Sequence, residues 1–203
     1  GKDSFHPAVW ENAQRVSEGQ IWAIPWLSDP RALIYWRDLL GNAGVDEKHA
    51  FESPEKVIET CELLQASGMQ TPVALPIESH LYMGQMALSW LWGAGGELVS
   101  PDGRQALFAQ PQARRGLAAY FEMRRFVSKD APTFINATQA MIERKSAFLY
   151  SGIGTLNTII MQPSLAGRLD QLGVALPPGP AFLGSSSLVI WKHSRREQEA
   201  LEL

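Results

Sequence analysis

The chain has 203 residues, a hydrophobic content of 45% and a formal net charge of −3 at pH 7. This composition is typical of a globular protein with a substantial core, in one large domain or two small ones. No run of Lys and Arg exceeds two residues, and nucleic-acid binding requires a basic surface, so we expect no nucleic-acid partner. No apolar stretch reaches the roughly 18 to 20 residues that span a bilayer.

The first half of the chain is predicted to alternate short strands with helices. Pro25 ends the first apolar run, which suits a strand. Ser53 before Pro54 predicts the N-cap and first turn of a helix, and Gly68 predicts its end. In order, we expect a strand at 21–24, a strand at 31–36, a helix from 38 to 41 or 44, a helix from 54 to 68, a strand at 73–75 and a helix at 81–92.

The second half continues the alternation, which favours an α/β fold. The helix at 111–126 is expected to bury one side that carries Leu117, Tyr120, Phe121 and Phe126. Ser194 is expected to open a last helix, which is so short before Leu203 that we expect a longer natural chain. The remaining predicted elements are a hairpin at 98–108, a helix at 136–145, a strand at 147–150, a helix at 156–161, and strands at 174–176 and 187–192.

Aromatic residues crowd the start of the chain, where Trp22, Trp26, Tyr35 and Trp36 fall within fifteen residues. They form part of the core, or they line a place where a flat ligand binds. Trp26 has turn-like neighbours, and Asp29 and Arg31 beside it supply an acceptor and fork-shaped donors for sugar hydroxyls. The same two interpretations apply to Trp92, whose ring could stack on a pyranose or pack in the core.

Signals for an enzyme are weak. The turn at 151–155 follows an apolar strand but lacks the spacing of a phosphate-binding loop. Asp29 and Glu78 could converge as an acid and base pair, although a place on the surface or in a turn is the simpler interpretation for each. The lone Cys61 excludes an intrachain disulfide, and the four histidines lack HxxxH or HxH spacing, so no metal site is expected. The hydroxyls at 185–187 could donate to a ligand or satisfy loop backbone.

Several segments, in order, resemble motifs of the extracellular solute-binding proteins of family 1. The stretch LIYWRDLLGNAG is similar to the family's L-x-Y-N-K-D-L-F-x-x-A-G, with Trp36 in place of the usual Asn and Arg37 in place of the usual Lys. The segment after Phe51 lacks the family's Trp. The other similar segments are 53–64, 90–96, 140–152, 173–179 and 184–200.

This resemblance implies a periplasmic-binding-protein type II-like α/β fold, in which two lobes close by hinge motion on a ligand in the cleft between them. The chain would cover mainly the second lobe. The implied division is a first-lobe remnant at 1–28, the second lobe at 29–176, and a truncated return to the first lobe at 177–203.

The resemblance also implies a function: the substrate-binding component of an ABC importer, with a carbohydrate as ligand and a membrane permease as partner. It implies no catalysis and no cofactor, and a periplasmic or lipid-anchored extracellular location. An α/β enzyme and an interaction module with the same fold are the alternatives. From the resemblance and the residue chemistry together, the predicted ligand-binding residues are Trp26, Asp29, Arg31, Glu78, His80, Trp92, Ser151, Thr155, Ser185 and Ser186.

Overall fold

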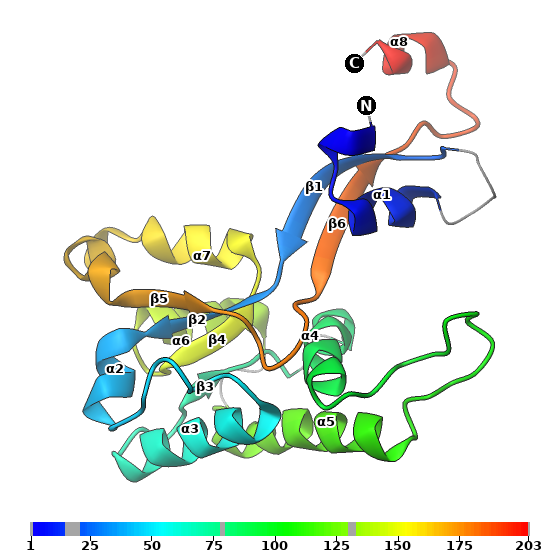
Figure 1. The fold of residues 1–203 in the computed structure, drawn as a ribbon. Helices are drawn as coiled ribbons and strands as arrows, with labels where there is room; N and C mark the ends of the chain where they lie inside the picture. Colours follow the sequence, from blue (N-terminus) through cyan, green and yellow to red (C-terminus); the bar gives the residue numbers. More distant parts are fainter. Residues whose placement is uncertain (1, 15–20, 78–79, 130–132, 203) are drawn as a thin grey trace. The chain divides into compact units, whose positions relative to one another are not determined.

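A computed structural model describes residues 2–14, 21–77, 80–129 and 133–202 (Figure 1). Contacts divide the chain into two compact units, Pro30–Phe182 and a smaller unit formed by Gly1–Asp29 with Leu183–Leu203. The predicted lobe boundaries remain a prediction, and each unit is described by itself. Within the described residues, no helix has both the length and the apolar character needed to cross a membrane.

A four-stranded sheet in the order β3-β4-β2-β5 forms the centre of the larger unit. β2 (Ala32–Trp36) pairs antiparallel with both β4 (Phe148–Ser151) and β5 (Leu172–Ala175). β3 (Val73–Ala74) pairs parallel with β4. Helices cover this mixed sheet, so the predicted α/β class is confirmed (Figure 1).

The residues of β2 alternate between two separate cores. Leu33 and Tyr35 pack with residues of the helices α3 (Pro54–Ala66), α4 (His80–Gly93) and α5 (Pro111–Glu122) on one face. Ile34 and Trp36 pack with residues of α6 (Phe134–Ile142), α7 (Ile153–Ile160) and the 3-10 helix η3 (Pro163–Gln171) on the other. Successive side chains of a strand point to opposite faces, and helices cover both faces of this sheet, so the whole strand is apolar.

The helices of the larger unit lie close to their predicted positions. They are α2 (Arg37–Asn42), α3 (Pro54–Ala66), α4 (His80–Gly93), α5 (Pro111–Glu122), α6 (Phe134–Ile142) and α7 (Ile153–Ile160), with the 3-10 helices η2 (Met123–Phe126) and η3 (Pro163–Gln171). The start of α3 confirms its prediction, because Ser53 Oγ accepts a hydrogen bond from the Lys56 amide at 3.2 Å. Gly68, at φ +100°, follows the end of this helix in the left-handed conformation. The hairpin is confirmed by the antiparallel bridge between Val99 and Ala106.

Glycine lets α4 and α5 approach each other closely. A Cβ added at Gly116 of α5 would lie 2.8 Å from Leu91 Cα and closer still to the Trp90 carbonyl. Gly96, just after α4, meets the backbone of Ala113 in the same way. Because glycine has no side chain at these two positions, the backbones of α4 and α5 can lie in direct contact.

The smaller unit differs most from expectation. Its elements are η1 (Lys2–Ser4), α1 (Pro7–Gln14), β1 (Ile24–Pro30), β6 (Leu183–Leu188) and α8 (Glu197–Leu201), and β1 pairs with β6 in a two-stranded sheet. The strand predicted to stop at Pro25 instead runs through it. In a two-stranded sheet each strand has an unpaired edge, where proline costs no ladder bond.

Three further predictions were wrong in detail. The strand predicted at 187–192 lies at 183–188. Ser194 does not cap the last helix: its Oγ accepts from the Arg196 amide, and the helix begins at Glu197. Phe121 is 53% exposed, because the sheet side of α5 is occupied by Ala113, Gly116 and Tyr120 instead.

Candidate functional site

Predicted site residues meet at one end of the central sheet. β2 begins where β4 ends, and Ala32 is directly opposite Ser151 in the antiparallel register. Arg31, just before β2, and Ser151, the last residue of β4, therefore lie at the same end of neighbouring strands. We call the polar and aromatic groups gathered here the sheet-end cluster; it comprises Arg31, Tyr82, Gln85, Ser89, Phe134, Tyr150, Ser151 and Thr155.

Arg31 is a buried cation held from three directions. Its Nη2 donates to Gln85 Oε1 at 3.0 Å, and its guanidinium lies 5.5 Å from the centre of the Tyr82 ring. Its backbone amide donates to the Phe182 carbonyl at 2.9 Å. A guanidinium positioned in this way loses little further freedom when it binds a ligand oxygen.

Tyr82 extends this arrangement into an aromatic stack. Its ring stacks on Phe134 with 5.3 Å between centroids and 22° between the planes. Both residues are half-buried. Arg31, Tyr82 and Phe134 lie one after another in space and combine hydrogen-bond donors with an aromatic surface. These are the two features by which proteins bind carbohydrates.

Ser151 and Thr155 are brought together, but they bond to each other. Their hydroxyl oxygens lie 2.7 Å apart, and both side chains are buried. The pair ties the end of β4 to the first turn of α7, which follows through Gly152. This bond gives both residues a structural role, and their contact with a ligand stays a prediction.

A second buried hydroxyl pair joins α4 to the sheet. Ser89 Oγ and the Tyr150 hydroxyl are 2.6 Å apart. Burial raises the pKa of Tyr150 above its ordinary value, while the hydrogen bond with Ser89 and the charge of Arg31 oppose that rise. The phenol is therefore neutral at physiological pH and remains a hydrogen-bonding group.

The two tryptophans near the end of α4 have different environments. Trp90 is fully buried. It makes edge-to-face contacts with Tyr120 and Tyr150, with 5.4 and 5.3 Å between the ring centroids. Trp92 is half-buried. It follows Gln85 by seven residues and so lies on the same face of α4, about 10 Å further along the axis.

Four of the other predicted residues belong to the smaller unit. Trp26 is 64% exposed on β1, Asp29 is half-buried, and Ser185 and Ser186 are exposed on β6, all within the smaller unit. Glu78 lies outside the described residues. His80 is the first residue of α4, and its side chain is likewise outside the description.

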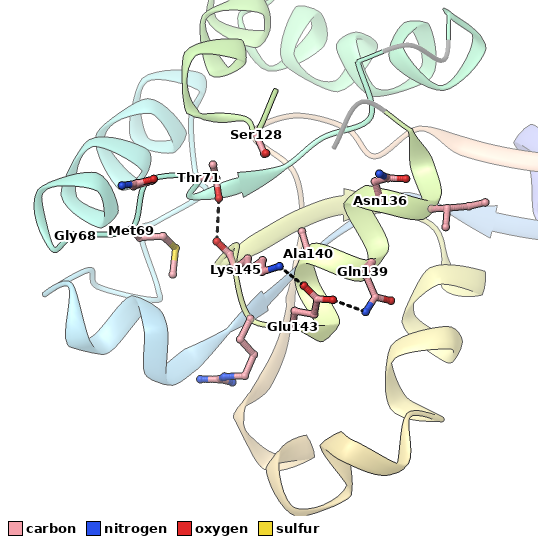
Figure 2. Close-up of a pocket in the computed structure, with 12 residues that line it drawn as sticks. Gly68, Met69, Thr71, Ser128, Asn136, Gln139, Ala140, Glu143 and Lys145 are labelled. Carbon is pink, nitrogen blue, oxygen red and sulfur yellow. Dashed lines mark hydrogen bonds and ion pairs between the residues drawn. The ribbon is translucent and has the colours of Figure 1, made fainter. Parts of the chain in front are cut away.

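A shallow depression of about 780 Å³ lies at the other end of β3 and β4 (Figure 2). Several of its polar groups are engaged with each other: Glu143 pairs with Lys145 at 2.5 Å and accepts from Gln139 at 2.8 Å. Thr71 Oγ1 donates to the Lys145 carbonyl at 3.1 Å. In the part of the chain that the structure describes, no three His, Cys, Asp or Glu side chains gather in a way that could hold a metal ion.

Comparison with known proteins identifies structures with the same architecture. No family model matches the chain. The GacH receptor of Streptomyces glaucescens superposes on 99% of the chain with a TM-score of 0.81 at 18% identity, and the maltose-bound MalE3 of T. maritima on 98% with a TM-score of 0.74 at 24% identity. The chain has the fold of the sugar-binding proteins of ABC transporters.

A curated relative agrees with this fold. The diacetylchitobiose binding protein DasA of Streptomyces coelicolor is 25% identical over 94% of the chain. The match covers 46% of DasA, and the structural matches cover 51% of GacH and 52% of MalE3, so the chain spans about half the length of these relatives. The resemblance to solute-binding proteins and the expected type II fold are confirmed.

The sequence reasoning missed five members of the sheet-end cluster: Tyr82, Gln85, Ser89, Phe134 and Tyr150. A signal for three of them was present in α4. Tyr82, Gln85 and Ser89 recur at intervals of three and four residues in an otherwise strongly apolar helix, which places their side chains on one face. Phe134 and Tyr150 carried no such signal, because their neighbours come from distant parts of the chain.

Proposed function

We propose that this chain belongs to the substrate-binding component of an ABC importer and that its ligand is a carbohydrate. The observation that carries the proposal is the fold match over nearly the whole chain to proteins that are named as sugar-binding proteins or are solved with a bound sugar. The weaker sequence relationship with DasA points in the same direction. The membrane permease as partner, and a periplasmic or lipid-anchored extracellular location, are parts of the same proposal.

The sheet-end cluster supports this function by its chemistry. A pyranose presents hydroxyls at its rim and C–H groups on its faces. The Arg31 guanidinium offers forked donors to neighbouring hydroxyls, and the half-buried Tyr82 and Phe134 rings offer an aromatic surface to C–H groups. We therefore add Tyr82, Gln85 and Phe134 to the predicted ligand-binding residues.

The smaller unit contributes a second set of proposed contacts. Trp26 exposes 64% of its surface, although burial of such a ring would be favourable. The exposed Trp26 offers a stacking surface, and the half-buried Asp29, three residues further along β1, offers a hydrogen-bond acceptor. We retain Trp26, Asp29, Ser185 and Ser186 as proposed ligand contacts on this basis.

We also propose that the protein binds its ligand without transforming it. The relatives are named as binding proteins and receptors. The alternative of an α/β enzyme predicts turnover of a sugar that the protein binds. Incubation with each bound sugar, followed by chromatography of the products, tests this alternative directly.

A thermal-shift screen against mono-, di- and oligosaccharides tests the main proposal. A ligand that binds only the folded protein raises Tm, by an amount that grows with its concentration relative to Kd. We expect at least one carbohydrate to raise Tm and to give a saturable calorimetric titration. Absence of any shift across the panel at millimolar sugar would contradict the proposal.

Trp26→Ala and Asp29→Ala then test the contacts of the smaller unit. Each should weaken binding of the identified sugar by about tenfold or more, while far-UV circular dichroism stays unchanged. Trp191→Ala is the matched control, because Trp191 is also exposed in the smaller unit and has no proposed ligand role. Unchanged affinity in both test variants would remove Trp26 and Asp29 from the site and leave the Arg31 cluster to be tested separately.

A further inference from the structure

The segment 178–182 ends the larger unit and packs against the end of α4. A Cβ added at Gly179 would lie 2.6 Å from Gly93 Cα and closer still to the Ser89 carbonyl. A Cβ added at Gly93 would in turn lie 2.8 Å from the carbonyl carbon of Pro178. The two backbones are therefore in direct contact, which glycine permits because it has no side chain. We call residues 178–182 the exit segment.

The other end of the exit segment is bonded to the start of β2. The Phe182 carbonyl accepts a hydrogen bond from the Arg31 amide at 2.9 Å. This bond fixes the backbone of the residue whose guanidinium belongs to the sheet-end cluster. Pro180 lies between Gly179 and Phe182, and the fixed φ of proline limits how far one end of the segment can move without the other. The position of the exit segment on α4 therefore affects the position of Arg31.

The Tyr150 hydroxyl lies where α4, β4 and the exit segment meet. Its oxygen is 2.6 Å from Ser89 Oγ, and the carbonyl of Ser89 lies against Gly179. Burial raises the pKa of Tyr150, and the hydrogen bond with Ser89 lowers it. A hydrogen bond with the Phe182 backbone and the charge of Arg31 lower it further, so both groups lie near the phenol. The phenol is thus linked to both ends of the exit segment.

A second buried tyrosine shows what is particular to Tyr150. Tyr120 is as deeply buried and also packs edge-to-face against Trp90. Its hydroxyl has no hydrogen-bond partner among the residues that the structure describes. Packing against Trp90 therefore does not require a bonded hydroxyl, and the bonds of the Tyr150 hydroxyl are not explained by that packing.

We propose that Tyr150 is a positioning residue for ligand binding, and that its hydroxyl acts through the exit segment on Arg31. By fixing Ser89 and the Phe182 backbone, the hydroxyl holds the Arg31 backbone in the place from which the guanidinium reaches a ligand. The proposal rests on the carbohydrate-binding function proposed above, in which Arg31 contacts the ligand. Phenylalanine at position 150 would keep the ring in the core and release the exit segment.

Tyr150→Phe and Tyr120→Phe form the matched pair of variants, and the first test needs no ligand. NMR measures hydrogen exchange of the Arg31 amide, which should accelerate by about threefold to tenfold in Tyr150→Phe, as expected for the loss of one hydrogen bond. It should stay unchanged in Tyr120→Phe. The Trp36 amide, which donates to the Ala147 carbonyl at 2.9 Å at the other end of β2, reports any loss of global stability in the same spectra.

The second test measures affinity by calorimetry, with the carbohydrate that raises Tm most in the thermal-shift screen as the probe. Tyr150→Phe should weaken its binding by about threefold to tenfold, whereas Tyr120→Phe should not. Thr60→Val is a further control, because it removes another buried hydrogen bond, from Thr60 Oγ1 to the Ala50 carbonyl at 2.9 Å. It should lower stability and leave the affinity unchanged.

Several outcomes would overturn the proposal. Exchange of the Arg31 amide in Tyr150→Phe that is unchanged, or accelerated no more than exchange at Trp36, would assign the hydroxyl a structural role only. Equal weakening of sugar binding by Tyr150→Phe and Thr60→Val would do the same. Failure of the proposed function is a separate result, namely absence of sugar binding by the unchanged protein, and the exchange test of the link between Tyr150 and Arg31 does not depend on it.

Discussion

Substitution of Gly116 by Ala should loosen the contact between α4 and α5. The new methyl group would lie 2.8 Å from Leu91 Cα and closer to the Trp90 carbonyl, and both are backbone atoms that cannot rotate away. Forcing a methyl group into such a contact costs typically about 1–3 kcal/mol. Alanine recovers up to about 1 kcal/mol through its better helix propensity. We therefore expect a net loss of about 1–2 kcal/mol of unfolding free energy.

Gly84→Ala in α4 provides the matched control. It is also a helical glycine, but its added Cβ meets no atom within 4 Å. Only the propensity gain remains, so stability should rise by about 0.5–1 kcal/mol. Urea unfolding followed by tryptophan fluorescence, in which the buried Trp90 reports on the larger unit, measures both variants. If Gly116→Ala is as stable as Gly84→Ala, the close approach of the two helices does not determine their packing.

Three further predictions concern the sheet-end cluster and the core. Arg31→Ala should weaken binding of an identified sugar by about tenfold or more, as measured by calorimetry, whereas the exposed Arg37→Ala should not. Tyr150→Phe leaves the buried Ser89 hydroxyl without its 2.6 Å partner and should cost about 1–2 kcal/mol in urea unfolding. Burial first, and then a hydrogen bond to a neighbouring glutamate, raise the pKa of Tyr35 to about 12. Because the unfolded phenol ionises near pH 10.0, stability should fall as pH rises from 10 toward 12, and Tyr35→Phe should remove that part of the pH dependence.

The aromatic residues near the start show where sequence reasoning reached its limit. Core packing and ligand binding were both open for them. Tyr35 and Trp36 are core residues, and Trp36 Nε1 donates to the Met141 carbonyl at 3.0 Å. Trp22 and Trp26 are exposed in the smaller unit. Composition could not separate these cases, because burial of an aromatic ring depends on what packs against both faces of its strand.

The polar site had the same limit for a related reason. Ser151 and Thr155 are only four residues apart, on the two sides of the turn from β4 into α7, so their contact is local in the sequence. The Arg31 side chain bonds to Gln85, 54 residues away, and Ser89 to Tyr150, 61 residues away. Such pairs depend on strand order and helix placement, which local patterns do not encode.

By itself, the sequence determined the local elements and the class of the fold. The Ser53 cap, the hairpin around the 98–108 turn and the alternation of strands with helices depend on neighbouring residues, and family-like segments along the chain indicated the type II fold. Only the tertiary structure decided which aromatics are buried, which hydroxyls bond to each other and which apolar face of α5 stays exposed. These properties arise when distant segments exclude water from one another, and no short stretch of residues carries that information.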